Sequence, residues 1–281
     1  MNRPGDPLPD PGRGTDRGPS DRSRSEQPPA GPGPKERGSP MRVVSVNLSS
    51  EKGTVKRPHG EGTIDAFGLA GDAHAGVWHR QVSLLGAETI ARFAAEMGRA
   101  IAPGEFAENL TVAGLEAGDC AIFDRIRAGE AELEVTQIGK ECHGDACAIF
   151  RETGACVMPR AGIFARVVRP GRIRAGDPVE LRPRALRCLV VTLSDRAADG
   201  AYEDLSGPRL AGLLEEFLRT SKFRPRIERS LLPDDPEALR SELAAHLAAG
   251  CDLIFTTGGT GIGPRDRTPE VVSGLCDRLI P

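Results

Sequence analysis

The pattern of hydrophobic and polar residues after position 41 has a period of two in several short stretches, which is typical of strands that bury one face. The clearest of these stretches are 44–48, 131–135, 163–168 and 179–181. One stretch differs, because apolar residues recur at i, i+3, i+4 and i+7 over 90–97 and predict an amphipathic helix. Many short strands joined by glycine-rich turns favour a closed or nearly closed β-barrel.

The pattern changes after the arginine-rich segment 183–187, which we interpret as a linker. Residues 188–193 form a continuous apolar run, as in a strand buried in a parallel sheet. A leucine-rich helical stripe follows, and then a weaker strand, a second helix and a third strand. These elements are expected over 210–218, 226–232, 239–247 and 252–255. Alternating strands and helices predict an α/β domain over 188–281, with a mostly parallel sheet, after a first domain over 41–182.

The first forty residues contain ten prolines, seven glycines and only three apolar side chains, so we expect a disordered tail over 1–40. Met41 is an alternative start. The whole chain has a net charge of −3, which argues against general nucleic-acid binding. A membrane span is not expected, because no apolar run approaches the roughly 18 residues that it needs. Seven cysteines without a secretory signal favour a reducing cytoplasm.

The strongest candidate site is the glycine-rich run over 256–270, which follows a predicted buried strand. Its glycines allow the backbone to approach a ligand and to aim N–H groups at phosphate oxygens. Thr268 is expected to cap a new helix, and Pro269 to be its first residue. Asp266 adds a carboxylate that could hold Mg²⁺ beside a phosphate. The alternative is a glycine-rich surface turn.

Two further strand ends carry acids. Ser194 and Asp195 follow the first strand of the domain, and Asp234 and Asp235 follow the second. Asp235, which precedes a proline, could be only a helix cap. Because ligands of open α/β sheets bind beyond the carboxyl ends of the strands, three such segments predict one site.

These motifs resemble the molybdopterin adenylyltransferase family (Mog/MoaB-like). The resemblance is carried by 194–196, 200–204, 232–234 and 256–269. It implies that molybdopterin is adenylylated with Mg-ATP, that Asp234 and Asp266 are the critical acids, and that Asp266 holds Mg²⁺. The family forms trimers, and its domain continues through a further glycine/acid motif, so we expect 188–281 to be an incomplete copy. The implied ligand-binding residues are Ser194, Asp195, Thr257, Gly258, Gly259, Thr260 and Gly261.

The first domain has its own polar stretches at 68–80, 104–111 and 139–143. Cys142 lies between Lys140 and His143, and nearby cations raise the thiolate fraction of a cysteine. That environment suits a persulfide carrier or a soft metal ligand. Cys142 with His143, Cys147 and Cys156 could also bind zinc, although no CxxC pair is present. The remaining cysteines are expected to pack as small apolar side chains. They are Cys120, Cys188, Cys251 and Cys276.

The segment 41–182 resembles the MOSC domain family, on the basis of 68–86, 104–111, 139–143 and 156–167. The resemblance implies a β-barrel that binds molybdenum cofactor or transfers sulfur, with Cys142 as sulfur carrier or molybdenum ligand. It also implies that the cofactor is contacted by His74, Arg80, Asn109 and Lys140.

Both resemblances indicate a fused protein of molybdenum-cofactor biosynthesis, with molybdopterin and ATP as ligands. Other biosynthesis proteins or a sulfur donor are expected as partners, and nucleic acid and membrane are not. Two alternatives stay open: a non-catalytic carrier of cofactor or sulfur with a degenerate second domain, and a redox or zinc protein built on the Cys142 cluster.

Overall fold

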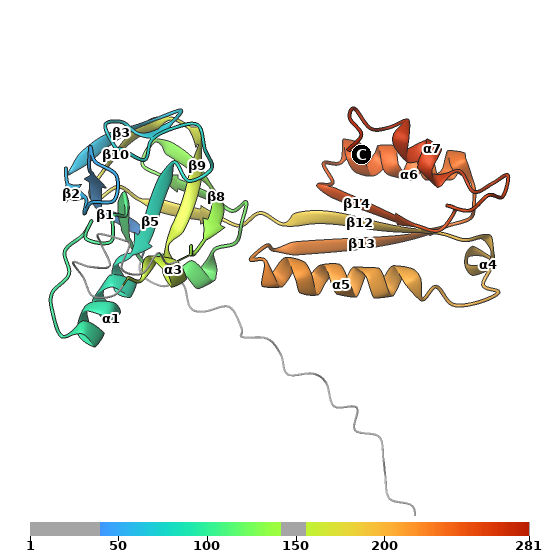
Figure 1. Cartoon of the computed structure of the whole chain (residues 1–281), viewed down its shortest axis with the longest axis horizontal. Helices are drawn as coiled ribbons and strands as arrows, with labels where there is room; N and C mark the ends of the chain where they lie inside the picture. Colours follow the sequence, from blue (N-terminus) through green and yellow to red (C-terminus); the bar gives the residue numbers. More distant parts are fainter. Residues whose placement is uncertain (1–39, 142–155, 281) are drawn as a thin grey trace, which may run out of the picture. The chain divides into compact units, whose positions relative to one another are not determined.

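The structure, a computed structural model, describes residues 40–141 and 156–280 (Figure 1). The expected tail and the Cys142 cluster with His143 and Cys147 therefore lie outside the described residues. Within the described part of the chain, no helix is long and apolar enough to cross a membrane.

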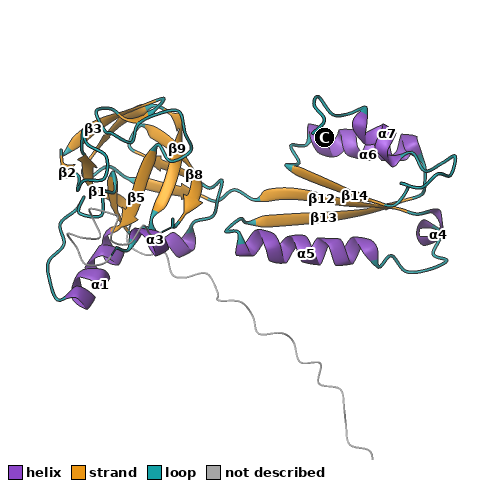
Figure 2. Cartoon of the chain, in the orientation of Figure 1, coloured by secondary structure: helices purple, strands orange, loops and turns teal. Residues whose placement is uncertain are grey.

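The strands of the first half form two sheets (Figure 2). The larger sheet has the order β11-β7-β8-β9-β5-β6-β1-β2 and is antiparallel except between β5 and β6. The smaller sheet has the order β10-β3-β4. The strands are β1 (Arg42–Leu48), β2 (Arg57–Pro58), β3 (Glu61–Asp65), β4 (Gly68–Leu69), β5 (Val82–Gly86), β6 (Leu110–Ala113), β7 (Arg125–Ala128), β8 (Ala131–Ile138), β9 (Ile163–Arg169), β10 (Gly171–Arg174) and β11 (Val179–Arg182).

The predicted β-barrel is not confirmed. One isolated bridge, between Arg42 and Pro178, brings β1 close to the segment before β11. Around it, the Val43 N–H donates to the Asp177 carbonyl and the Val179 N–H donates to the Met41 carbonyl, each at 2.9 Å. Among the described residues these contacts do not extend into a ladder between β1 and β11, so closure of the large sheet is not confirmed.

The alternation seen in the sequence does place one face of each strand in the core. In β8, Ala131, Leu133 and Val135 are fully buried, as their period-two spacing predicts. Glu134 between them is also buried, and it forms ion pairs with Arg125 and Arg166 of the neighbouring strands. The predicted helix is α1 (Ala87–Met97), which ends at Gly98 with φ of 63°. Two short helices, η1 (Ala117–Asp119) and α3 (Met158–Ala161), were not predicted.

The second half contains the predicted α/β arrangement. Its sheet has the order β13-β12-β14, and both pairs are parallel. The central strand starts two residues before the predicted run, and the strand that looked weak in the sequence is eight residues long. The elements are β12 (Leu186–Leu193), α4 (Asp195–Ala198), α5 (Ser206–Thr220), β13 (Pro225–Leu232), α6 (Pro236–Ala248), β14 (Leu253–Thr257) and α7 (Thr268–Ser273).

Helices cover both faces of this sheet (Figure 1). Leu189, Val191 and Leu193 of β12 pack with the α6 and α7 side chains Leu239, Leu243 and Val271. On the opposite face, Leu186 and Cys188 pack with Leu218 of α5. Successive residues of a strand point to opposite faces, so a strand between two helical layers must be apolar throughout. This explains the continuous run that the sequence shows here.

The turn from β5 into α1 leaves no room for a side chain at Gly86. An added Cβ would lie 2.2 Å from the backbone oxygen of Leu115. Gly86→Ala should therefore lower the free energy of unfolding by about 1–3 kcal/mol, measured by urea denaturation. Gly118→Ala is the control, because a Cβ there meets nothing within 4 Å. Equal midpoints for the two variants would contradict the proposed steric cause.

Candidate functional site

A pocket of about 360 Å³ opens at the carboxyl ends of the three parallel strands. The chain passes from β12 to β13 on one side and later to β14 on the other, so the strand order reverses here. Such reversal points leave a crevice in open α/β sheets. The pocket is lined by Thr192, Leu193, Ser194, Ala197, Tyr202, Glu203, Asp204, Leu205, Ser206, Asp234, Thr257, Gly258, Gly259 and Asp266.

Two of the predicted acids bind each other's backbone. The Asp195 N–H donates to Asp234 Oδ2 at 3.1 Å, and the Asp234 N–H donates to Asp195 Oδ1 at 2.9 Å. The other Asp195 oxygen forms an ion pair with Arg265 of the glycine-rich loop. The three strand ends are thus joined at one point, as the sequence predicted for their acids.

The glycine-rich loop folds back on the end of β12. Gly258 has φ of 93°, and an added Cβ would lie 2.0 Å from the Leu193 backbone oxygen. Gly259 has φ of 59°, and its Cβ would lie 2.4 Å from Thr268 Oγ1 and 3.5 Å from Asp234 Oδ1. Asp266 closes the loop by accepting the Gly263 N–H at 3.0 Å. Glycines are required where the backbone comes this close to the acids.

The predicted cap of the helix after this loop is wrong in detail. Helix α7 does begin at Thr268 with a proline in its first turn, but its N-cap residue is Arg267, without a side-chain cap. The Thr268 hydroxyl instead donates to the Gly258 carbonyl at 3.1 Å, and Thr268 is buried. This threonine holds the loop against the helix. Asp235, by contrast, does cap α6 by accepting the Glu237 N–H.

Asp204 was not among the predicted site residues, although it lines the pocket. Its carboxylate accepts hydrogen bonds from the Thr192 hydroxyl at 2.9 Å, the Gly207 N–H at 3.0 Å and both groups of Ser206. Burial opposes the charge, but these hydrogen bonds outweigh it and lower the pKa of Asp204. The signal in the sequence was an Asp two residues before a Ser at a helix start.

Tyr202 is a second lining residue that the sequence prediction omitted. Its hydroxyl lies 2.8 Å from Ser194 Oγ, and the Arg196 guanidinium lies 4.9 Å from its ring centroid. Ser194 also accepts the Ala197 N–H at 3.3 Å and so caps α4. The side chain of Ser194 is therefore fixed at the rim of the pocket.

The structure brings most of the predicted residues of this domain together. Those that line the pocket are Ser194, Asp234, Thr257, Gly258, Gly259 and Asp266. Asp195 lies behind them, bonded to Asp234. Thr260 and Gly261 lie further along the loop and do not line the pocket. Their assignment as ligand-binding residues stays a prediction.

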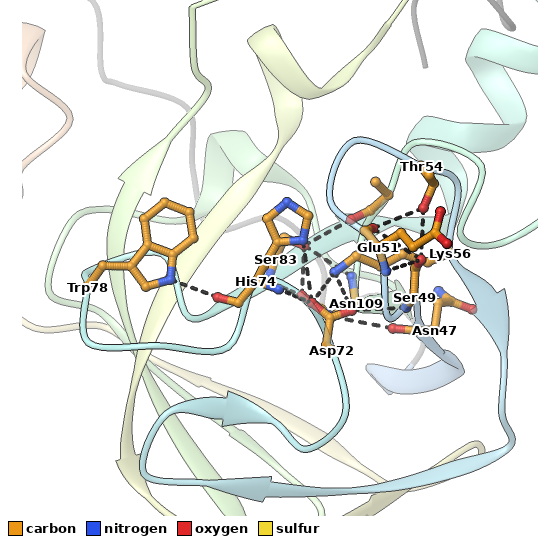
Figure 3. A network of polar contacts seen from close by, with 11 residues as sticks. Asn47, Ser49, Glu51, Thr54, Lys56, Asp72, His74, Trp78, Ser83 and Asn109 are labelled. Atoms are coloured by element: carbon orange, nitrogen blue, oxygen red, sulfur yellow. Dashed lines mark hydrogen bonds and ion pairs between the residues drawn. The ribbon is translucent and has the colours of Figure 1, made fainter. Parts of the chain in front are cut away.

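Two predicted residues of the first half, His74 and Asn109, belong to a polar network that contains a buried ion pair (Figure 3). Lys56 Nζ lies 2.8 Å from both oxygens of Asp72, and each side chain is 1% exposed. Asp72 also accepts the His74 N–H at 3.0 Å and the Ser49 N–H at 3.2 Å. Burial opposes its charge, but His74 and Lys56 outweigh burial and hold the pKa of Asp72 well below its usual range.

His74 lines a small pocket of about 240 Å³. Arg80 does not line it but stacks on Trp78, which does. The pocket is lined by Lys52, His74 and residues 75–78. The Trp78 indole N–H donates to the His74 carbonyl at 2.8 Å, and the Arg80 guanidinium lies 4.8 Å from the Trp78 ring centroid. His74 Nδ1 lies 3.5 Å from Asp72 Oδ1 and so already faces an acceptor. Arg80 Nε is buried without a hydrogen-bond partner in the described structure and could bind an acceptor.

Asn109 and Lys140 lie apart from that pocket. Asn109 is 1% exposed, and its amide oxygen accepts the N–H and the hydroxyl of Ser83, each at 3.0 Å. Its amide nitrogen donates to the Asn47 carbonyl. The backbone N–H of Lys140 donates to the Pro159 carbonyl. Neither assignment is tested by these contacts, although both polar atoms of the Asn109 side chain already have partners within the fold.

The predicted core positions of the cysteines are confirmed only in part. Cys120 and Cys188 are buried as expected, and burial raises the pKa of their thiols to about 12 and about 11. Cys251 is half-buried. Cys276 is exposed in the described structure, so its predicted core position is wrong. Among residues 40–141 and 156–280, no cluster of three or more His, Cys, Asp or Glu could hold a metal ion.

Comparison with known families assigns the two halves separately. The MOSC domain model matches residues 71–180, and the model described as a probable molybdopterin binding domain matches residues 189–281. The chain therefore carries a MOSC domain followed by a molybdopterin-binding-type domain.

Curated relatives match the second half. The chain is 41% identical over 86 residues to a molybdenum cofactor biosynthesis bifunctional protein of Synechococcus elongatus. The aligned region covers 31% of this chain and 25% of that protein. It is 38% identical over 96 residues to a molybdopterin adenylyltransferase of Helicobacter pylori, and the aligned region covers 33% of this chain and 51% of that protein. The corresponding protein of Escherichia coli is 37% identical over 98 residues, covering 34% and 48%. The chain thus spans about half the length of these adenylyltransferases.

Solved structures resemble each half. The YuaD protein of Bacillus subtilis matches with a TM-score of 0.42 and 20% identity, over 50% of this chain and 95% of that one. The molybdopterin biosynthesis enzyme MoaB of Thermus thermophilus matches with a TM-score of 0.30 and 37% identity, over 34% of this chain and 58% of that one. With TM-scores below 0.5, these likenesses add no further support.

The Lys56–Asp72 pair should be essential for the stability of the first half. Lys56→Met leaves the Asp72 carboxylate buried without its cation, and such a loss typically costs about 3–5 kcal/mol in the free energy of unfolding. Urea denaturation measures it. The exposed Lys52→Met is the control and should change stability little. A small effect of Lys56→Met would mean that solvent reaches Asp72.

Glu108 should make stability fall with rising pH. Its carboxyl is fully buried, Oε2 has no hydrogen-bond partner in the described structure, and burial raises its pKa despite bonds from Gly104 and Thr111. An unfolded glutamate titrates near pH ~4.3, so ionisation costs native stability as pH rises from there through the higher native pKa. The unfolding free energy of wild type relative to Glu108→Gln should fall over that range. A flat difference would contradict a raised pKa.

Proposed function

We propose that this protein acts in molybdenum-cofactor biosynthesis and binds molybdopterin in the pocket at the carboxyl ends of β12, β13 and β14. The observation that carries the proposal is the meeting of Asp234, Asp266 and the glycine loop in one pocket. Support comes from the family match over 189–281 and from relatives named molybdopterin adenylyltransferase. The glycine-rich backbone suits a phosphate group.

The proposed reaction is adenylyl transfer from ATP to molybdopterin. An oxygen of the molybdopterin terminal phosphate attacks the α-phosphorus of ATP, the bond to the β-phosphate oxygen breaks, and pyrophosphate leaves. The residues present fit a magnesium nucleotide, since Mg²⁺ is commonly bound by one or two carboxylates together with substrate phosphates. Asp266 would hold the ion, which neutralises phosphate charge when bound. Asp234 faces Gly259 and would orient the phosphates against the glycine loop.

For the first half, we propose that the MOSC domain binds the cofactor or carries its sulfur, with Cys142 as carrier or molybdenum ligand. Arg80 supports this, because its Nε is buried without a hydrogen-bond partner in the described structure. Our proposed domain limits are 41–182 and 188–281, joined by 183–187. A cytoplasmic location, a β-barrel for the first domain, and a trimer with other biosynthesis proteins or a sulfur donor as partners belong to the same proposal.

A second candidate function is a carrier that binds molybdopterin without transferring a nucleotide. The pocket with Asp234, Asp266 and the glycine loop needs no nucleotide to bind molybdopterin, so the same observation is compatible with this candidate. Both candidates require the pocket, but only the first requires ATP.

The test is a pair of measurements on the full chain: molybdopterin binding by fluorescence quenching, and pyrophosphate release with molybdopterin and Mg-ATP. Asp266→Asn should lower turnover by at least about a hundredfold, because a preorganised charge at the reacting phosphate is lost. Molybdopterin binding should persist and the melting temperature should hardly change.

Asp235→Asn is the matched control, because Asn also caps a helix and Asp235 does not line the pocket. Binding without pyrophosphate release in the wild type would support the carrier. Absence of binding would contradict both candidates.

A further inference from the structure

We infer that Asp195 is a positioning residue, which holds Asp234 and the glycine-rich loop in place and does not itself bind the ligand. This inference rests on the proposed function, and it changes the predicted role of Asp195 from ligand binding to support. It starts from the lining of the pocket, which includes Ser194 and Asp234 but not Asp195.

The N–H and both carboxylate oxygens of Asp195 contact residues that follow the other two strands. Its N–H donates to Asp234 Oδ2, its Oδ1 accepts the Asp234 N–H, and its Oδ2 pairs with the Arg265 guanidinium. Its backbone carbonyl accepts the Asp199 N–H within α4. Both carboxylate oxygens and the backbone N–H of this residue are thus already used in contacts within the fold.

The two contacts with Asp234 determine how that acid is oriented. Because Oδ2 is held by the Asp195 N–H, Oδ1 is the oxygen that points toward Gly259, 3.5 Å from the site of an added Cβ. The ion pair between Asp195 and Arg265 positions the second acid, Asp266. Arg265 immediately precedes Asp266 in the chain, and the Asp266 carboxylate accepts the Gly263 N–H within the same loop. Asp195 therefore fixes both acids from one position.

The side chain of Asp195 is 25% exposed, whereas that of Arg265 is 69% exposed. An exposed ion pair alone contributes little. Here the same carboxylate is also held by a backbone N–H, so its geometry does not depend on the arginine. Removing the carboxylate and removing only its charge should consequently have different effects.

Three variants separate these contributions. Asp195→Asn keeps an oxygen for the Asp234 N–H but loses the ion pair, as does Arg265→Met. Asp195→Ala loses both. We expect all three to raise the Mg²⁺ concentration for half-maximal turnover, since the loop that carries Asp266 is released. Asp195→Ala alone should also lower kcat, because Asp234 is no longer oriented.

A second readout does not depend on turnover. Limited trypsin digestion of the native full chain, analysed by mass spectrometry, should show cleavage after Arg267 several-fold faster in all three variants than in wild type. Asp199→Ala, at the C-cap of the same short helix and not among the residues that line the pocket, is the control and should digest and turn over like wild type. Melting temperatures identify any variant that is globally unfolded.

The inference is overturned if Asp195→Ala is cleaved like Asp199→Ala, or if it is cleaved faster while kcat and the Mg²⁺ requirement stay unchanged. It is also overturned if Asp195→Asn matches Asp195→Ala in every measurement, because the oxygen would then contribute nothing. If wild type shows no turnover, the proposed adenylyl transfer fails. Faster cleavage after Arg267 in all three variants would then still support the positioning role of Asp195, because cleavage does not depend on turnover.

Discussion

The parallel pairing of β12 with a strand on each side is the constraint on which the candidate site depends. Because both ladders are parallel, all three strands end at the same edge of the sheet. Because the chain goes to β13 first and to β14 afterwards, the loops diverge over β12 and leave a hollow between them. The acids do not create this hollow. They occupy the place where backbone topology leaves polar groups facing solvent.

The buried faces of β12 explain why this strand can support the site. Leu189, Val191 and Leu193 face α6 and α7, while Cys188 faces α5. A strand packed on both sides cannot shift its register without exposing a whole row of side chains. The loop after Leu193 therefore starts from a rigid point, and the hydrogen bonds between Asp195 and Asp234 connect two loops that each begin from fixed strands.

The sequence predicted this half well because its patterns are local. A continuous apolar run, a helical stripe and a glycine-rich loop can each be recognised within fifteen residues, and the acids at the strand ends follow from the order of these elements. What could not be predicted depends on contacts across the fold. Nothing adjacent to Asp204 shows that Thr192, twelve residues earlier, donates to it, and nothing adjacent to Thr268 shows that its hydroxyl reaches Gly258.

The first half was harder for the same reason. Period two located its strands, but closure of a sheet depends on which strands form the edges, and the two-residue strand β2 gives no pattern in the sequence. Lys56 and Asp72 are sixteen residues apart and form a buried ion pair that no spacing rule indicates. Asn109 was selected as a ligand residue from its motif, whereas its amide is occupied by Ser83 and Asn47.

The start of α5 has a consequence for recognising related chains. At Gly207 an added Cβ would lie 2.5 Å from both Asp204 Oδ2 and Thr192 Oγ1, so no side chain fits between the acid and the strand that it binds. A threonine near the end of an apolar strand, followed by Asp-x-Ser-Gly at the next helix, is therefore a sequence signature with a steric cause. A chain that carries a larger residue in place of the glycine would have to anchor this loop by other means.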